Sequence, residues 1–567
     1  MQTKLFLSIA VISSGVAFSS CSKMGALSAD NFNVTPSPLE AVGDQVPATI
    51  NGRFPEKYLK KTATVTVTPV LRYTGGETAG TPATFQGEKV EGNDQTISYR
   101  VGGNYTMKTN FQFVPAMEKS DLYLTFNAKK GNKTFKIPDV KVGEGVLATS
   151  ALVNRTLKST HAAFAPDAYQ HIIKQKAEAN IKFLIQQAKI RNSELQSVST
   201  QNFIKTLRDI QSDQERKALD NVEVSAYASP DGGMKLNTAL AQNREKTTQA
   251  YVNKTLKNTG LNTDVNTKYT AEDWEGFQEL VSSSNIQDKE IILRVLSMYK
   301  DPEEREKQIR NISAGFTDLA NEILPQLRRS RISVNYDLIG RSDEEIQQQY
   351  KTDASKLSVE ELLYSATLSD NASEQEAIYQ KTAQVYPNDY RAYNDLAVQA
   401  YQKGDFAAAQ EYVNKALNVN STAAEPNVNA GLLALLNNDL TSAQTYLSKG
   451  SNSASVGEAL GNMYLKQGKY AQAVKAFGDT KSNSAGLAQL LTKDYMSAAS
   501  TLSSVEKPDA MTYYLKAIIA ARTNNTSIAL DNLRNAVKED SSLAGYAAND
   551  LEFKKIANNA TFQLLTK

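Results

Sequence analysis

Apolar and polar residues alternate along the first quarter of the chain, in a pattern typical of half-buried β-strands. Residues 63–67 and 105–113 are two such runs, in which every second side chain is apolar or aromatic except Thr109. Turn residues such as the pair Gly75-Gly76 separate the runs. The pattern over residues 47–155 therefore predicts an antiparallel β-sandwich of about seven strands.

Strand and helix patterns alternate between residues 160 and 340. A helical pattern begins near Pro166, and the capping-box sequence Ser193-Glu194-Leu195-Gln196 predicts the start of a later helix. The expected strands share period-two alternation and lie at residues 181–185, 222–228, 265–269 and 332–336. Several helices are expected between the last two strands, from about Trp274 to Leu324. We expect an α/β domain with a helical insertion.

Small residues recur at regular intervals from residue 341 to the end. The turn positions Gly404, Asn438 and Gly468 lie 34 and then 30 residues apart, which resembles the tetratricopeptide repeat. Such units bury their apolar faces only by stacking, so residues 341–567 are predicted to form an α-solenoid with a concave peptide groove. The residues expected to line this groove are largely uncharged: Asn394, Gln399, Asn427, Asn429 and Tyr513. A protein partner of unknown identity is expected there.

One strand–turn–helix segment, residues 222–244, carries candidate binding chemistry. The turn Ser229-Pro230-Asp231-Gly232-Gly233 leads into a helix on which Asn237, Leu240 and Arg244 share one face. Free N–H groups at a helix start and a guanidinium group suit a carboxylate ligand. Alternatively, Ser229 and Asp231 are ordinary turn residues, Asn237 fixes the loop, and Arg244 is a solvated or packing side chain.

The same segment resembles the OmpA-like fold, in the YASPDG variant of a Bacteroidetes branch. The sequence PQLRRSRISVNY at 325–336 resembles the closing strand of that fold. The resemblance implies a peptidoglycan stem peptide as ligand, because in the commoner motif a loop carboxylate and a helix arginine hold its diaminopimelate. Residue matching places the arginine at Arg244 and the carboxylate position at Ser229, with Asp231 as its substitute. Arg328, Arg329 and Arg331 either extend this anionic site or are solvated.

The N-terminus has the pattern of a bacterial lipoprotein signal. Lys4 precedes an apolar run, and the sequence FSSC ending at Cys21 resembles a relaxed lipobox, which implies acylation of Cys21; the alternative is an ordinary secretory signal. Residues 22–46 are polar and proline-containing, so they are expected to form a tether. In the Bacteroidetes lipoproteins that this N-terminus resembles, an acidic run just after the cysteine resembles an export tag to the cell surface. No acidic run follows Cys21. The resemblance therefore implies the periplasmic face of the outer membrane, with membrane contact through the lipid anchor only.

Composition excludes several functional classes. The formal net charge is only +2, so no basic surface for nucleic acid is indicated. The two histidines, His161 and His171, do not have the spacing of a metal site, and no nucleophile or phosphate-loop motif is present. We therefore expect no metal, cofactor or enzymatic activity in this multidomain α+β protein. Two functions remain: a peptidoglycan-associated lipoprotein whose repeats bind a protein, or a periplasmic assembly or secretion scaffold whose OmpA-like pocket no longer binds the wall.

Overall fold

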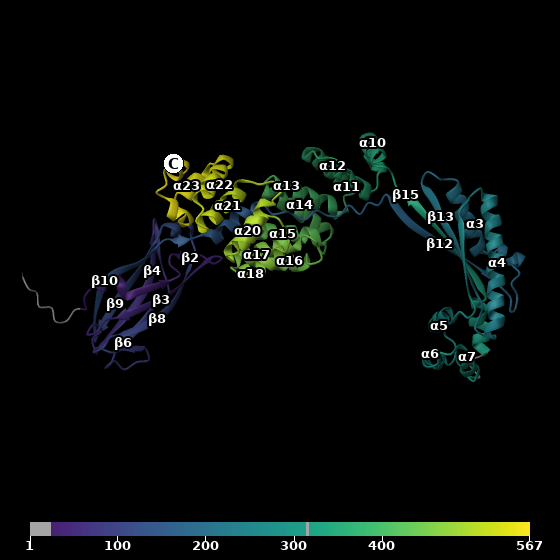
Figure 1. Cartoon of the computed structure of the whole chain (residues 1–567), viewed down its shortest axis with the longest axis horizontal. Coiled ribbons are helices and arrows are strands. Elements are labelled where there is room, and N and C mark those ends of the chain that lie inside the picture. The colour runs from purple at the N-terminus through teal and green to yellow at the C-terminus, as the bar shows by residue number, and fades with distance from the viewer. Residues whose placement is uncertain (1–23, 313–316) are drawn as a thin grey trace, which may run out of the picture. The chain divides into compact units, whose positions relative to one another are not determined.

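The structure is a computed structural model that describes residues 24–312 and 317–567 (Figure 1). The chain forms two compact units. Unit 1 consists of residues up to 166 together with residues 369–567, and unit 2 consists of residues 167–368. The predicted signal peptide and Cys21 lie outside the described residues. No helix in the described ranges is both long and apolar enough to cross a lipid bilayer.

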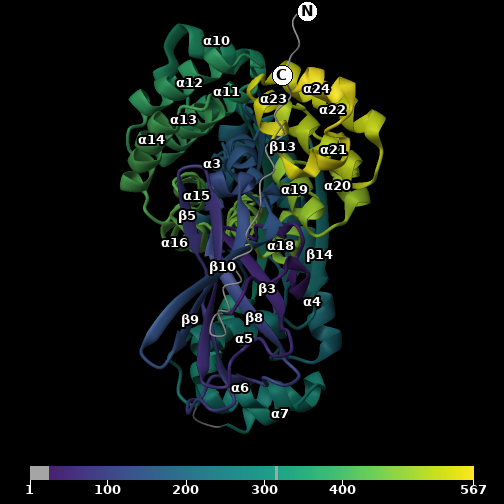
Figure 2. The same ribbon diagram turned by 90° about the vertical axis from the view of Figure 1, so that its left-hand side faces the viewer.

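The N-terminal part of unit 1 is β-rich, as predicted, and contains several sheets (Figure 2). A three-stranded sheet has the order β1 (Phe32–Thr35), β3 (Gln45–Phe54), β8 (Gly103–Gln112). A larger sheet has the order β10 (Lys133–Glu144), β9 (Asp121–Lys130), β4 (Ala63–Tyr73), β6 (Ala83–Gly87), β7 (Gln95–Ile97), with β5 (Gly76–Ala79) paired to β4. The short strands β2 (Leu39–Glu40) and β11 (Val146–Leu147) pair in parallel, and the 3-10 turns η1 (Ala29–Asn31) and η2 (Pro115–Lys119) complete the region.

Alternating side chains of these strands form one apolar core. Phe54, Phe85 and Tyr105 are almost fully buried, and the rings of Phe85 and Tyr105 lie 4.2 Å apart between centroids. The region differs from the prediction at its start. Strands β1 and β2 and the first residues of β3 lie within residues 22–46, so most of the predicted tether is folded; Val34 and Leu39 there are buried because they join the core.

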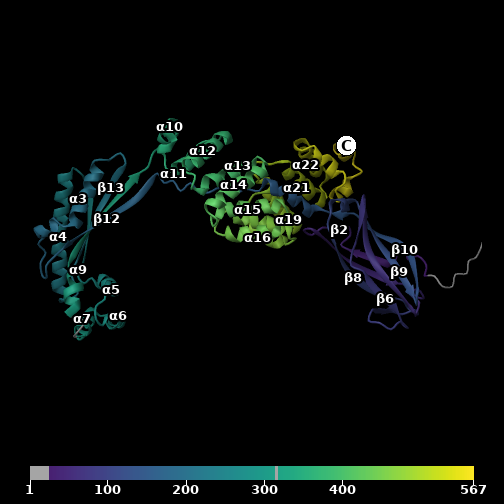
Figure 3. The same cartoon turned by 180° about the vertical axis from the view of Figure 1, so that it is seen from behind.

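Unit 2 contains a four-stranded sheet with the order β12 (Ile172–Lys182), β15 (Arg329–Ile339), β13 (Lys217–Tyr227), β14 (Asp264–Thr270). β15 is antiparallel to both neighbours, and β13 is parallel to β14. Helices α3 (Val198–Gln211) and α4 (Met234–Thr259) cover one face of the sheet (Figure 3). The helix predicted near Pro166 is wrong: the chain is extended there and continues into β12, because the β12–β15 ladder runs the full length of both strands.

The predicted insertion between the last two strands of this sheet is present and has its own core. Its helices are α5 (Trp274–Ser283), α6 (Lys289–Met298), α7 (Pro302–Arg310), the π-helix η5 (Leu319–Ile323) and α9 (Leu324–Leu327). Other short elements of unit 2 are α2 (Asn192–Leu195), α10 (Asp343–Asp353), η6 (Ala354–Lys356) and α11 (Val359–Thr367). Helices α10 and α11 therefore belong to unit 2, whereas the sequence analysis assigned residues 341–368 to the repeats.

The C-terminal part of unit 1, residues 369–567, is an array of paired helices that resembles a tetratricopeptide solenoid and is called the array below. Its helices are α12 (Ala372–Val385), α13 (Tyr390–Gln402), α14 (Phe406–Val419), α15 (Ala424–Leu436), α16 (Leu440–Lys449), α17 (Val456–Lys466), α18 (Tyr470–Phe477), α19 (Asn483–Leu491), α20 (Tyr495–Ser503), α21 (Ala510–Arg522), α22 (Thr526–Glu539), α23 (Ser542–Ala547), η7 (Leu551–Ile556) and α24 (Ala560–Leu565).

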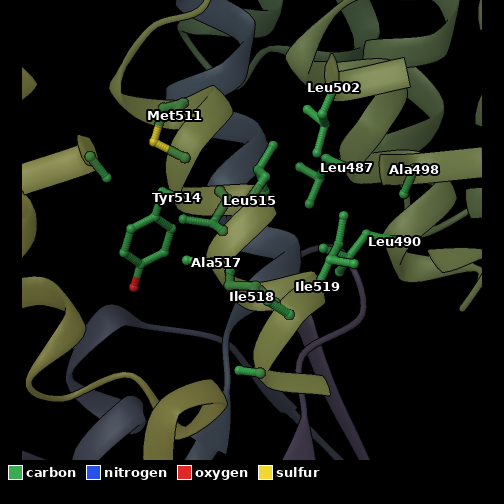
Figure 4. Close-up of a cluster of buried hydrophobic side chains, with 14 of the residues drawn as sticks. Leu487, Leu490, Ala498, Leu502, Met511, Tyr514, Leu515, Ala517, Ile518 and Ile519 are labelled. Atoms are coloured by element: carbon green, nitrogen blue, oxygen red, sulfur yellow. The ribbon is translucent and has the colours of Figure 1, made fainter. Parts of the chain in front are cut away.

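The same kind of contact between neighbouring helices recurs in the array. A Cβ atom added to Gly431 would lie 2.6 Å from Leu447, and one added to Gly461 would lie 2.7 Å from Phe477. In each case the glycine of one helix lets a large side chain of the next helix approach its backbone, and only glycine leaves that space. Farther along, Leu487, Tyr514 and Leu515 belong to a continuous apolar core (Figure 4).

Candidate functional site

The predicted key residue of the OmpA-like motif, Arg244, is completely buried in unit 2, with 0 % of its surface exposed. Its Nε donates to the carbonyl of Gln187 (3.0 Å), Nη1 to that of Tyr227 (2.8 Å) and Nη2 to that of Leu184 (3.2 Å). Its guanidinium carbon also lies 5.1 Å from the ring centroid of Phe183. Helix α4 thus holds together the segment that follows β12 and the last residue of β13.

Burial, and to a smaller extent the nearby charge of Arg328, lower the pKa of Arg244 to about 10, while the charge of Asp231 opposes the shift. The side chain nevertheless stays protonated at neutral pH, and three backbone carbonyls stabilise it. Arg244 forms no ion pair in the described part of the chain. The guanidinium group that the sequence predicted to face a ligand is therefore turned inward, because the adjacent loop supplies carbonyl acceptors; carboxylate binding by Arg244 stays a prediction.

The turn after β13 forms a compact polar network. The Ser229 hydroxyl donates to the Asp231 carboxylate, and Arg328 Nη2 lies 2.9 Å from the other oxygen of that carboxylate. Arg328 Nε also donates to Ser229 Oγ at 3.3 Å. The side chains of Arg328 and Asp231 are only 12 % and 18 % exposed. The structure therefore brings Ser229, Asp231 and Arg328 together, as predicted for a site, but the two charges already neutralise each other.

Among the described residues, the side chains of the remaining candidates form no hydrogen bond with those of the Ser229–Asp231–Arg328 network. Asn237 is buried and donates to the carbonyls of Ser229 (3.2 Å) and Gly232 (2.6 Å), so it fixes the turn. Leu240 is half-buried on α4. Arg329 pairs with Asp273 at 3.1 Å and lies over the Tyr227 ring.

The inserted helices cover the turn. A cavity of only about 10 Å³ beside Asp231 is lined by apolar side chains of the insertion, including Trp274, Phe277 and Ile309. Arg310 of α7 also donates to the backbone carbonyl of Asp231 at 2.9 Å. A more open cavity of about 340 Å³ lies elsewhere on unit 2 and has the charged side chains Lys182, Glu279, Arg329 and Arg331 in its wall.

The second candidate site, the inner surface of the array, is occupied by the chain itself. Residues 149–166, called the strap below, consist of η3 (Thr149–Leu152), α1 (Val153–Thr156), η4 (Leu157–Ser159) and an extended segment. Asn429 accepts from the Ala163 N–H (2.7 Å) and donates to the Ala163 carbonyl (2.9 Å). Asn394 donates to the same carbonyl at 2.8 Å.

Further side chains of the array bind the strap. Asp395 accepts from the Ala165 N–H at 2.8 Å, and the Tyr401 hydroxyl donates to the Leu157 carbonyl at 2.7 Å. Neither of these array residues was predicted from the sequence. The sequence does contain a signal for this contact. Asn394 and Asp395 are two adjacent polar residues in a helix that is buried, and buried polar side chains are rarely left without a hydrogen-bond partner.

Only part of the predicted groove lining contacts the strap through hydrogen bonds. Asn394 and Asn429 do so, whereas Gln399 donates to Gln375, and Asn427 donates to carbonyls at the start of its own helix. Tyr513 packs against the apolar core of the array.

The histidines have ordinary partners. His161 of the strap lies 3.0 Å from Glu458 of the array, which raises the pKa of His161, and His171 lies 3.1 Å from the hydroxyl of Tyr364. Across residues 24–312 and 317–567 there is no cluster of three or more side chains suited to a metal ion.

The sequence matches no family model and no curated protein. Solved structures with similar folds include a tetratricopeptide repeat protein from Parabacteroides merdae, with 13 % identity, 46 % of this chain and 98 % of that chain covered, and a TM-score of 0.29. Pseudomonas aeruginosa pilF has 18 % identity over 38 % of this chain and all of that chain (TM-score 0.28). YrrB, a protein with an unusual peptide-binding site, has 19 % identity over 31 % and 97 % of the two chains (TM-score 0.22). The shared feature is the tetratricopeptide-like fold of the repeats.

Proposed function

We propose that this protein is a non-enzymatic scaffold of the cell envelope whose array works by binding an extended peptide segment. The observation that supports this proposal is the pairing of Asn394, Asn429 and Asp395 with the backbone of Ala163 and Ala165. Tetratricopeptide-like arrays are protein-interaction modules, and here the bound peptide belongs to the same chain.

The array recognises the strap mainly through its backbone. Two side-chain amides bind both the N–H and the carbonyl of one residue, Ala163, whose side chain is fully buried. Backbone recognition does not depend on sequence, whereas the buried position admits only a small side chain. The inner surface therefore suits an extended segment with alanine-sized residues at this point.

Trypsin sensitivity of the strap tests this proposal. Lys158 is exposed, but the strap around it is held, so cleavage there requires local opening. Replacing both Asn394 and Asn429 with alanine leaves the buried N–H and carbonyl of Ala163 without partners, which costs about 1–3 kcal/mol for each group. We expect cleavage after Lys158 to become at least about tenfold faster, as measured by mass spectrometry of timed digests.

The matched control is Asn414→Ala, an exposed asparagine on the outer helix α14 that accepts only from the exposed Gln410. Its cleavage rate should equal that of the wild type. An unchanged rate in the Asn394→Ala/Asn429→Ala protein would show that the array does not hold the strap.

The proposed scaffold is attached to the membrane by lipid at Cys21 and faces the periplasm from the outer membrane. The support for this part is the sequence alone: the apolar run that precedes Cys21 and the absence of an acidic run after it. Several acyl chains together hold a protein stably, because each buried CH₂ contributes ~0.8 kcal/mol.

A finer proposal is that unit 2 binds the peptidoglycan stem peptide at the turn after β13. It is supported by the juxtaposition of Ser229, Asp231 and Arg328, one acid and one base at the end of a central strand. These groups match the ammonium and carboxylate of diaminopimelate in charge. Binding would require the Asp231–Arg328 ion pair to open and the covering helices α5 and α7 to move.

Sedimentation with purified sacculi tests wall binding. If the ion pair opens to receive the ligand, Asp231→Asn and Arg328→Gln should each reduce retention about tenfold or more, because a lost charge-assisted contact costs about 1.5–3 kcal/mol. Arg294→Ala, which removes an exposed arginine of α6, is the control. Equal retention of all four proteins would remove this turn from wall binding and leave the scaffold proposal intact.

A further inference from the structure

The contacts between strap and array are distributed along the whole strap, in an order opposite to that of the repeats. From the first strap residue to the last, the hydrogen-bonded pairs are Thr149 with Glu552, Thr156 with Ser484 (2.9 Å), Thr160 with Asn462 (3.1 Å), Ala163 with Asn429 (2.7 Å) and Ala165 with Asp395 (2.8 Å). Every second helix from α13 to α19 (α13, α15, α17 and α19) and the C-terminal turn η7 therefore contribute. The strap is held at many points rather than at one.

The strap is also part of the apolar cores of the array. Leu152 and Val153 belong to the core formed by the C-terminal repeats, and Leu157 and Ala163 belong to the core formed by the first repeats. Each of these four residues is at most 4 % exposed. Full burial of a side chain such as leucine or valine contributes about 1.5–3 kcal/mol. Release of the strap would thus expose apolar surface as well as break hydrogen bonds.

The strap directly precedes unit 2 in the sequence. Unit 2 begins at Asp167, directly after the strap, and ends at Leu368, just before the first array helix. The last strap bond, from the Ala165 N–H to Asp395, is two residues before this entry point. Tension that pulls unit 2 away from the N-terminus therefore loads the contacts of the strap with the array, together with the second connection of unit 2 to the array at residues 368–369.

We propose that the array is a load-bearing clamp that holds the strap. Through its contacts with the strap, the inner surface of the array carries tension between the N-terminal end of the chain and unit 2. The biological purpose of this clamp rests on the scaffold proposal, since only an anchored chain is placed under tension. With the clamp closed, the strap stays folded on the array. With the clamp open, the strap would reach a total length of up to about 60 Å, at 3.3–3.6 Å per residue. The gain in length is about 20 Å, because only residues 149–159 are helical when bound, at about 1.5–2 Å per residue.

Single-molecule pulling on the full mature chain tests the clamp. The chain has one cysteine, Cys21, which in unlipidated protein serves as the first handle. Lys205→Cys, at an exposed position of α3 in unit 2, supplies the second handle. In the otherwise wild-type protein, no separate lengthening of about 20 Å should occur below the force that unfolds the β-rich region, whose own unfolding adds several hundred ångströms.

Two variants weaken the clamp from opposite sides. Asn394→Ala/Asn429→Ala changes the array, and Ala163→Leu changes only the strap by overfilling a fully buried position. Both should show the short lengthening at a lower force, before the unfolding step of the β-rich region, which stays at its wild-type force. Asn414→Ala should give the wild-type trace.

Two results would overturn the clamp. One is a short lengthening at low force in the wild-type protein, and the other is wild-type traces from both weakened proteins. If trypsin cleaves the Asn394→Ala/Asn429→Ala protein faster but its pulling trace is unchanged, the scaffold proposal stands and the clamp does not.

Discussion

Replacing Arg244 with alanine is expected to lower the free energy of unfolding of unit 2 by about 3–5 kcal/mol. The substitution leaves the carbonyls of Leu184, Gln187 and Tyr227 without their donor in a buried site, and each unsatisfied group costs about 1–3 kcal/mol. It also leaves a cavity beside Phe183. An effect of this size is expected of an internal structural residue, whereas an exposed ligand-binding arginine costs little stability when removed.

The single tryptophan makes this measurement specific. Trp274 lies in α5, so its fluorescence during urea unfolding reports on unit 2. Arg244→Lys keeps the charge but loses the planar guanidinium group with its several donors. The stability of this variant should lie between those of the wild type and the alanine variant. Arg208→Ala, at an exposed position of α3, should change stability by less than about 0.5 kcal/mol. A loss below about 1 kcal/mol for Arg244→Ala would contradict the structural role.

Unit 1 is expected to become more stable as the pH falls from 8 to 5. Burial raises the pKa of Asp395 to about 7, that of Glu118 to about 7 and that of Asp550 to about 6. The folded state therefore binds protons that the unfolded state releases at a pKa near 4, so stability falls as the pH rises from about 4 to about 7 and is constant above that window. We expect a gain of about 1–3 kcal/mol on acidification, of which Asp395 contributes a large part because it is almost fully buried.

Calorimetric melting of the full chain at several pH values checks this expectation. Asp395→Asn keeps an oxygen that accepts from the Ala165 N–H but carries no charge, so it should raise stability at pH 8 and weaken the pH dependence. Asp479→Asn, at an exposed position after α18, should melt as the wild type does at every pH. If Asp395→Asn has the same pH dependence as the wild type, Asp395 is not the group that titrates.

The repeat region could be predicted because its determinants are local. Gly431 and Gly461 each allow a large residue sixteen positions later to pack against the helix backbone, and this spacing is visible in the sequence. The β-rich region was predictable for the same reason, since alternation reports directly which side chains enter the core. The prediction for the start of that region was wrong. Residues 32–35 form strand β1 because they pair with β3, and their own sequence does not show this pairing.

The sites were harder to predict because their partners are distant in the sequence. The sequence correctly placed Asn237, Leu240 and Arg244 on one helix, but the acceptors of Arg244 lie 17 to 60 residues away. Motif spacing therefore could not show that its guanidinium group is turned inward. Likewise, Asn394 and Asn429 were expected in the groove, but their ligand, Ala163, is more than 230 residues before Asn394 and carries no motif.

Unit 1 consists of two separate stretches of the chain, and this affects how the protein folds during its synthesis. The strap leaves the ribosome before unit 2, and the helices that bury Leu152, Val153 and Leu157 follow only after the roughly 200 residues of unit 2 have been made. At 5–20 residues per second this interval is about 10–40 s. During that time an apolar segment remains uncovered, so we expect folding of this protein to depend on chaperones that shield residues 149–166 until the C-terminus has emerged.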